Sequence, residues 1–277
     1  MRFFHKKKAL SIGAAMLILL ALLLPLGAAA DEHGACGDPF MPIYDIQGDG
    51  SSSPVDGEVV VTEGVVTVDL QKNSQLSGFF IQDRKGDRDR DTSDGLFVYH
   101  RDYWTPEFDV SVGDLVRVKG TIDEQYGNTQ MEYLEEGTIC DTGIPPRATN
   151  VSAERFTANA EAYEGMYVTF PQALVISEYF NFERFGELVL TTDRQFQPTA
   201  VFEPGSVDAA NLAAANLLSR ITLDDGRTSS NPDPAIHPNG LEFNLTNLFR
   251  GGDTVADVTG VINYSFGLYR VPVSYTH

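Results

Sequence analysis

The most highly charged stretch of the sequence is DRKGDRDRDTSD. Its residues Asp87, Asp89 and Asp91 stand at every second position, which is the spacing of the first three ligands in a calcium-binding EF-hand loop. The rest of that loop is missing, because Thr92 stands where the sharp turn needs glycine and Val98 stands where a bidentate glutamate is needed. An EF-hand is therefore excluded. Two interpretations stay open: a looser Ca²⁺ site built from oxygen ligands, or a charged loop that faces water.

Basic and aromatic side chains are interleaved within this segment, which spans residues 83–94, and just after it. They are Arg84, Lys85, Arg88, Arg90, Tyr99, Tyr103 and Trp104. Proteins that bind single-stranded nucleic acid combine cations that follow the phosphates with aromatic rings on which the bases stack. These seven residues are the candidate nucleic-acid contacts. The alternative is a solvated loop followed by aromatic residues of the core.

Residue patterns for catalysis are scarce. Four histidines follow residue 30, namely His33, His100, His237 and His277. None lies in an H-x-H or H-E-x-x-H context, so nothing indicates a zinc site, and neither a G-x-S-x-G elbow nor a phosphate-binding P-loop occurs. Asp224 and Asp225 form a carboxylate pair that could hold Mg²⁺ or exchange protons, but their position before Gly226 favours a turn. The sequence predicts no complete catalytic site.

Short runs of β-branched and aromatic residues, separated by Gly and Pro, predict an all-β fold with a few short helices. The strands expected first are 59–68, 78–82, 95–99, 115–122 and 131–134. Gly64 interrupts the first of them, and a glycine inside a strand predicts a bulge or a sharp bend. Five short strands, the first of them bent, predict a five-stranded Greek-key barrel of the OB-fold type.

The chain then repeats this pattern. The matching residues are Gly113, Asp114, Gly120 and Gly127 in the first copy and Gly252, Asp253, Gly260 and Gly267 in the second. The last two glycines are equally spaced in both copies, although the second copy has one extra residue before them. The shared order predicts two OB-fold-like barrels in tandem, with coincidence among β-rich turns as the alternative.

The predicted organisation has five parts. They are a signal peptide (1–30), an N-terminal arm (31–56), barrel 1 (57–141), a linker with a short helix (142–162) and barrel 2 (163–277) with a helical insertion at 206–218. The linker begins with TGIPP, whose prolines exclude the interior of a strand. The insertion is rich in Ala and Leu, and Ser206 or Asp208 can cap it as a helix.

The first thirty residues have the features of a secretory signal peptide. Basic residues precede an almost wholly apolar stretch, and Ala28 and Ala30 supply a small-residue cleavage site. The alternative is an uncleaved anchor, because the apolar stretch could just span a bilayer. Cleavage takes away four basic and no acidic residues, so it changes the net charge from −19 to −23. We expect a secreted, soluble monomer without membrane contact, in which nucleic-acid binding needs a local basic groove or bridging cations.

Cys36 and Cys140 are the two cysteines of the sequence. Export permits a disulfide between them, and the pair would close a loop of about a hundred residues. Such a bridge stabilises a chain by about 4–5 kcal/mol in the chain-entropy treatment, and here it would pin the N-terminal arm to the end of barrel 1. Two free thiols are the alternative.

Several longer phrases are specific enough to compare with known families. In the first half they are CGDPFMPIYDIQGDG (36–50), SGFFIQDRKGDRDRDTSDGLFVY (77–99) and VGDLVRVKGTIDEQYGNTQM (112–131). In the second half they are YEGMYVTFPQALVISEYFNFERFGELVLT (163–191), RQFQPTAVFEPGS (194–206) and RITLDDGRTSSNPDP (220–234). These phrases resemble, in order, the OB-fold region of large secreted bacterial nucleases of the ExeM/NucH type. The resemblance covers most of residues 36–277.

In that family the region precedes an endonuclease/exonuclease/phosphatase domain, which hydrolyses phosphodiesters with a divalent metal. The resemblance implies DNA or RNA as the partner, and it assigns Mg²⁺ to a catalytic domain whose motifs do not occur here, so no catalytic residue is carried over. We expect an accessory region that binds nucleic acid for a nuclease domain lost from, or encoded apart from, this chain. The alternatives are a metal-dependent nuclease in its own right, and a carbohydrate-binding or structural secreted protein that uses the same barrel faces.

Overall fold

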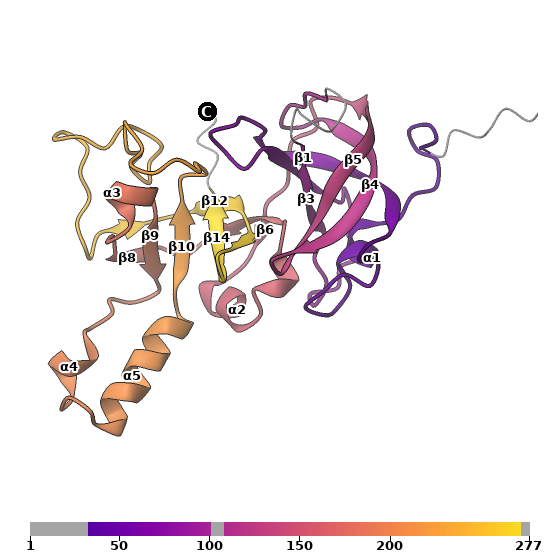
Figure 1. Ribbon diagram of the computed structural model, residues 1–277. Helices are drawn as coiled ribbons and strands as arrows, with labels where there is room; N and C mark the ends of the chain where they lie inside the picture. Colours follow the sequence, from indigo (N-terminus) through magenta and orange to yellow (C-terminus); the bar gives the residue numbers. More distant parts are fainter. Residues whose placement is uncertain (1–32, 101–107, 273–277) are drawn as a thin grey trace, which may run out of the picture. The chain divides into compact units, whose positions relative to one another are not determined.

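The computed structural model describes residues 33–100 and 108–272, so the predicted signal peptide, Tyr103 and Trp104 lie outside the described residues. The chain is mostly β with a few short helices, which confirms the predicted class (Figure 1). Within the described ranges, no helix is long and apolar enough to cross a membrane. All the elements named below lie in the compact unit that begins at Ala35.

Five strands of the first half close into a barrel. They are β1 (Val59–Leu70), β2 (Gly78–Gln82), β3 (Gly95–Tyr99), β4 (Leu115–Gln125) and β5 (Asn128–Asp141). The order around the barrel is β1-β2-β3-β5-β4, which then returns to β1. β3 lies parallel to β5, whereas the other neighbouring pairs are antiparallel.

The first strand pairs with a different neighbour along each of its two parts. β1 pairs with β4 up to Val65 and with β2 from Val65 onward. A Cβ atom at Gly64 would come within 2.9 Å of the Cβ of Ile81 on β2, so glycine lets the strands approach where the partner changes. The predicted interruption of this strand is present, but its irregular register lies between Val66 and Val68 rather than at Gly64.

β2 has apolar residues at successive positions because both of its faces are buried. Phe79 and Ile81 are fully buried in the barrel core, to which α1 (Ile43–Gln47) adds two fully buried isoleucines. Phe80 points the other way into a smaller cluster, where its ring centroid lies 4.7 Å from that of Phe97. The strand is thus buried on both faces, as its lack of alternation requires.

The N-terminal arm is held to the barrel by a disulfide and by hydrogen bonds from a buried arginine. A disulfide joins Cys36 to Cys140 on β5, which confirms the predicted pairing. The buried Arg117 on β4 donates a hydrogen bond to Glu63 on β1 at 2.8 Å. Its guanidinium also donates to two backbone carbonyls of the arm. A buried arginine needs such a complete set of acceptors to offset its lost hydration.

The strands of the second half are shorter. They are β6 (Thr149–Asn150), β7 (Tyr167–Phe170), β8 (Leu174–Glu178), β9 (Leu188–Thr191), β10 (Ile221–Asp224), β11 (Thr254–Val255), β12 (Val258–Val261), β13 (Asn263–Ser265) and β14 (Leu268–Pro272). They form one sheet with the order β11-β8-β9-β10-β14-β13 and another with the order β12-β7-β6. The described strands of this half therefore do not form the single closed five-stranded sheet that the sequence predicted.

Short helices accompany these two sheets. They are α2 (Ala153–Ala158), the 3-10 helix η1 (Glu161–Tyr163), α3 (Phe182–Phe185), α4 (Pro198–Val201) and α5 (Val207–Leu218). α2 confirms the predicted linker helix, and its Phe156 packs into the hydrophobic core of this half. α5 confirms the predicted insertion, because the hydroxyl of Ser206 caps it by accepting from the N–H of Ala209 at 3.1 Å.

A glycine–aspartate turn fixes the start of β4 in the first half. The N–H of Gly113 donates to the carbonyl of Val66 at 2.9 Å, and the N–H of Val66 donates to the carbonyl of Asp114 at 2.8 Å. Gly113 has a φ of 93°, a backbone conformation that is unfavourable for any residue with a side chain. The carboxylate of Asp114 closes the turn by accepting from the N–H of Ser111 at 2.8 Å. The middle of β1 is thereby tied to the entrance of β4.

The second half contains the same turn with the same bonds. Gly252 and Asp253 exchange two hydrogen bonds with Ile176 on β8, each 2.8 Å long. Gly252 has a φ of 96°, and the carboxylate of Asp253 accepts from the N–H of Arg250 at 2.7 Å. The two glycine–aspartate pairs found in the sequence therefore make equivalent contacts.

A buried glutamate lies where the two halves meet. Glu164 is 1 % exposed, and one of its carboxylate oxygens accepts from the N–H of Thr129 at 2.7 Å. The hydroxyl of Ser93 donates to the Glu164 carbonyl, and the backbones of Gly95 and Gly165 touch without room for a Cβ atom. Burial raises the pKa of Glu164 to about 9, so this side chain is protonated at neutral pH.

Removing the disulfide tests how much the arm depends on it. The double variant Cys36→Ala/Cys140→Ala loses a link across 104 residues, and its free energy of unfolding is expected to fall by about 4–5 kcal/mol, because the unfolded chain gains freedom. Urea denaturation measures the change, and the oxidised protein treated with a reductant should match the variant. A loss below about 1 kcal/mol would show that the noncovalent contacts of the arm suffice without the bridge.

Candidate functional site

The loop between β2 and β3 places its basic residues around a hollow. This hollow, of about 410 Å³, is lined by Lys85, Arg88 and Arg90 of the loop and by Arg155 of α2. The rest of its lining consists of two aspartates, three polar residues and three apolar or aromatic residues, namely Asp89, Asp94, Thr92, Thr149, Asn150, Ala162, Tyr163 and Met166. We call it the basic hollow. It joins three of the predicted nucleic-acid contacts with one arginine that lies more than sixty residues away in the sequence.

A second hollow borders the same loop. It has a volume of about 790 Å³ and is lined by Arg84 and Lys85, together with Arg147 and the prolines of the linker. Lys85 is thus shared between the two hollows. The predicted residue Arg84 faces this second hollow rather than the basic hollow. Cations of the loop 83–94, which we call the ridge, thus line both hollows.

The basic residues are concentrated here on an otherwise acidic chain. The sequence has 20 Lys and Arg residues, of which four lie within the first eight positions. Six of the remaining sixteen line the two hollows. In the basic hollow, four cations face two aspartates, which leaves a formal excess of two positive charges. A local excess of one sign attracts an oppositely charged ligand even where the net charge of the protein repels it.

Two carboxylates with raised pKa values lie within the loop. Burial and the neighbouring Asp94 raise the pKa of Asp83 to about 7, and burial and the charge of Asp87 raise the pKa of Asp94 to about 6. Asp83 accepts from the N–H of Ile43 at the start of α1, and Asp94 lines the basic hollow beside the arginines. The charge of the ridge therefore changes near neutral pH.

The predicted calcium ligands instead fold the loop onto itself. Asp87 accepts from the N–H of Asp89 at 2.7 Å and from the hydroxyl of Thr92 at 3.0 Å. Asp89 in turn accepts from the N–H groups of Arg90 and Asp91. In the ranges that the structure covers, no group of three or more His, Cys, Asp or Glu side chains is placed to hold a metal ion. These carboxylates stabilise turns, as Asx motifs do.

Of the three predicted aromatic contacts, the structure describes Tyr99, and this residue does not line the basic hollow. Tyr99, at the end of β3, is half-buried and lines a separate cleft of about 650 Å³. Phe79 and Phe80 are fully buried, so neither ring is available for stacking. Tyr103 and Trp104 lie outside the described residues. The contributions of Arg147 and Arg155 were missed, because both belong to the linker and stand in no basic motif.

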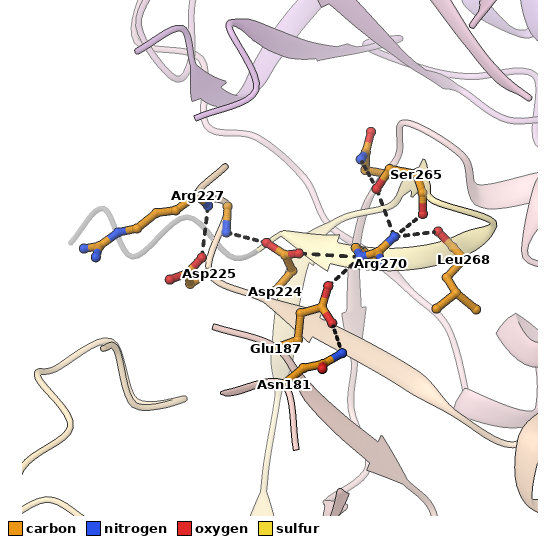
Figure 2. A network of polar contacts seen from close by, with 10 residues as sticks. Asn181, Glu187, Asp224, Asp225, Arg227, Ser265, Leu268 and Arg270 are labelled. Atoms are coloured by element: carbon orange, nitrogen blue, oxygen red, sulfur yellow. Dashed lines mark hydrogen bonds and ion pairs between the residues drawn. The ribbon is translucent and has the colours of Figure 1, made fainter. Parts of the chain in front are cut away.

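A second charged cluster lies in the second half and was also missed (Figure 2). Arg270 on β14 is almost buried, and its Nε donates to Glu187 at 3.1 Å and lies 3.7 Å from Asp224. Its Nη1 donates to the carbonyl and hydroxyl oxygens of Ser265, and Glu187 also accepts from Asn181 at 2.8 Å. Burial raises the pKa of Asp224 to about 7, although Arg270 acts in the opposite direction.

The carboxylate pair at Asp224 and Asp225 forms a turn, as the sequence favoured. Asp224 accepts from the N–H of Gly226 at 2.7 Å, and Asp225 accepts from the N–H of Arg227 at 3.0 Å. In Figure 2 the guanidinium of Arg227 points away from this cluster, and it donates to the carbonyl of Pro234 at 3.0 Å. The two carboxylates thus face different partners rather than one common site.

The comparisons with known proteins reach only the second half. Residues 157–276 match a family described as a domain of unknown function (DUF8508). This stretch begins within α2 and includes the strands from β7 to β14, whereas the closed barrel lies outside it. No curated protein and no solved structure matches the chain.

Replacing Arg270 tests the cluster of Figure 2. The variant Arg270→Met leaves Glu187 and Asp224 nearly buried without their cation, and we expect the free energy of unfolding to fall by about 3 kcal/mol at pH 8. The loss should be smaller at pH 5, because Asp224 is then protonated. The matched control Arg227→Met removes an exposed guanidinium and should cost less than about 1 kcal/mol. Equal losses in both variants would contradict a buried ionic role.

Proposed function

We propose that this chain is a secreted nucleic-acid-binding module, the accessory region of an extracellular nuclease. One observation carries the proposal: the basic hollow gathers Lys85, Arg88, Arg90 and Arg155 around a space of about 410 Å³. Each of its arginines can bind a phosphate through two parallel hydrogen bonds. The features of a signal peptide and the disulfide support a location outside the cell.

We also propose that the closed barrel is an OB-fold, a barrel whose loops bind oligonucleotides or oligosaccharides. The support is its order β1-β2-β3-β5-β4, with β3 parallel to β5. Its charged loop joins β2 to β3 and so belongs to the strands that carry ligands in this fold. The resemblance of the sequence phrases to secreted nucleases agrees with a nucleic-acid ligand.

The second half is best explained as an interrupted copy of the same barrel. β8, β9 and β10 pair in succession as β1, β2 and β3 do, and β10 lies parallel to β14 as β3 lies parallel to β5. β7 and β8 pair with β12 and β11, as successive residues of β1 pair with β4. β8 also pairs with β9, as the end of β1 pairs with β2. The equivalent glycine–aspartate turns support this correspondence.

A sequence-tolerant electrostatic mechanism follows for the basic hollow. Side chains that neutralise phosphates release the counterions of the nucleic acid, so binding weakens steeply as salt rises. The net charge, which is −19 for the full sequence and −23 after the expected cleavage, opposes the approach of a polyanion to the rest of the surface. We therefore expect modest affinity that depends on a few cations.

Removing these cations tests the proposal. The triple variant Lys85→Gln/Arg88→Gln/Arg155→Gln should bind a labelled single-stranded DNA 20-mer at least tenfold more weakly than the wild type in fluorescence anisotropy at low salt. The slope of log affinity against log salt should fall by about 2, since each phosphate contact contributes roughly 0.7. The control Lys72→Gln/Arg194→Gln/Arg250→Gln removes equal charge outside the hollows and should change affinity less. Absence of wild-type binding with and without Ca²⁺ would overturn the proposal.

The raised pKa values of the loop predict a pH dependence. As pH falls from 8 to 5.5, Asp83 and Asp94 take up protons and the ridge loses negative charge, so DNA affinity should rise. The variant Asp94→Asn should bind up to about fivefold more tightly at pH 8, because one screened charge contributes up to about 1 kcal/mol. It should also show a smaller pH effect. Asp91→Asn should keep the wild-type pH effect, and an unchanged pH effect in Asp94→Asn would contradict this explanation.

A further inference from the structure

Two hairpin tips carry an aromatic residue in a backbone conformation that favours glycine. Tyr126 joins β4 to β5 with a φ of 55°, and Gly127 follows it with a φ of 86°. Phe266 joins β13 to β14 with a φ of 53°, and Gly267 follows it with a φ of 75°. Two-residue hairpins of this kind prefer Asn, Asp or Gly at their first position. A bulky ring there strains the backbone.

The packing of these two rings gives no reason for the strain. Tyr126 is 88 % exposed and Phe266 is 94 % exposed, so neither adds to a hydrophobic core. An asparagine would make either turn more easily and would leave no ring in water. Strain that folding does not need points to a function.

Both rings border one cleft, the 650 Å³ cleft that Tyr99 lines. Phe97 and Tyr264 also line it, so five aromatic residues of the described part of the chain surround the space. We call it the aromatic cleft. Tyr264 lies close to the tip of the first hairpin, because a Cβ atom on Gly127 would come within 3.1 Å of its ring. The two hairpin tips therefore border the same cavity.

A row of polar side chains lines the cleft along β5. Asn128, Gln130 and Glu132 alternate along the strand, so they face the same side. The amide of Asn128 donates to Gln130 at 3.3 Å, and the amide of Gln130 donates to Glu132. Asn128 and Gln130 are buried, so their orientation is fixed before a ligand arrives. The row offers both donors and acceptors.

The charge of this cleft does not suit a polyanion. Among the residues that the structure describes, neither lysine nor arginine lines it, and Glu132 is the charged residue of its lining. Burial raises the pKa of Glu132, so its surroundings disfavour even this charge. The guanidinium of Arg270 lies 5.5 Å from the centre of the Phe266 ring, but it is paired with Glu187. The lining combines exposed rings with amides, and it suits a neutral ligand with apolar faces and many hydroxyl groups.

We infer that the aromatic cleft binds a neutral oligosaccharide or polysaccharide. The rings of Tyr126 and Phe266 stack on the apolar faces of pyranose rings, and the amides on β5 bond to the hydroxyl groups. OB-fold barrels can carry either sugars or oligonucleotides, and the residues rather than the fold make the choice here. This inference goes beyond the proposed function, since it uses none of the basic residues of the charged loop.

Replacing each strained ring by the residue that its turn prefers separates function from folding. In Tyr126→Asn and Phe266→Asn, each hairpin gains an Asn-Gly turn and loses its ring. Native gels that contain hydroxyethylcellulose, xyloglucan, dextran or laminarin measure how much each polysaccharide slows the protein. We expect at least one of them to slow the wild type, with an affinity at least tenfold lower in either variant. Both variants should melt at or above the wild-type temperature.

The control is Phe196→Asn, because this ring is 58 % exposed on the segment before α4 and lies outside the cleft. It should keep the wild-type mobility shift, as should the triple variant of the basic hollow. The inference is overturned if none of the four polysaccharides slows the wild type, or if the two asparagine variants are slowed equally. It is also overturned if they lose single-stranded DNA binding instead, which would assign the cleft to nucleobases. A lower melting temperature in both variants would show that the rings serve folding.

Discussion

Closure of the barrel depends on one strand that hydrogen-bonds on both sides, and the glycine–aspartate turn makes this closure stable. Gly113 adopts a φ of 93° so that its N–H reaches Val66 in the middle of β1, while Asp114 accepts the returning bond. A Cβ atom at Gly113 would approach the carbonyl oxygen of Ile144 to 2.8 Å, so no residue with a side chain fits at this position. In the second half, Gly252 and Asp253 form the equivalent pair of hydrogen bonds with Ile176 on β8.

Once the strands are closed, the loops between them can differ without cost to the core. The loop from β2 to β3 carries four of the cations that line the two hollows, and the linker supplies Arg147 and Arg155. Its counterpart between β9 and β10 holds α4 and α5 instead, and in α5 only Ala209 is buried. Under the proposed correspondence, one barrel plan thus presents a charged loop in one copy and an apolar helical segment in the other. The differences lie where ligand binding is expected.

Several features could be predicted because they depend on single residues or local patterns. Gly113 and Gly252 marked equivalent turns, Ser206 marked the start of a helix, and the cysteine pair marked the bridge. The all-β class followed from the short β-branched runs. In each case the physical cause lies within a few residues of the chain, or in the chemistry of one residue type.

Other features could not be predicted, because tertiary contacts create them. Arg155 reaches the basic hollow from a linker helix, and Arg270 meets Glu187 across more than eighty residues. Neither stands in a motif. The second half consists of many short strands, and the number of these strands could not be derived from the sequence pattern. Tyr126 precedes Gly127 in an ordinary sequence context, and only its φ shows that an aromatic residue occupies a position suited to asparagine.

The central claim is that nucleic acid binds at the basic hollow. Hydrogen–deuterium exchange of the full chain, measured with and without saturating single-stranded DNA at low salt, tests it most directly. The account predicts slower exchange in the loop 83–94 and in α2, with unchanged exchange at the hairpin tips near Tyr126 and Phe266. Slower exchange at those tips with an unaffected loop, or no change anywhere in the chain, would contradict it.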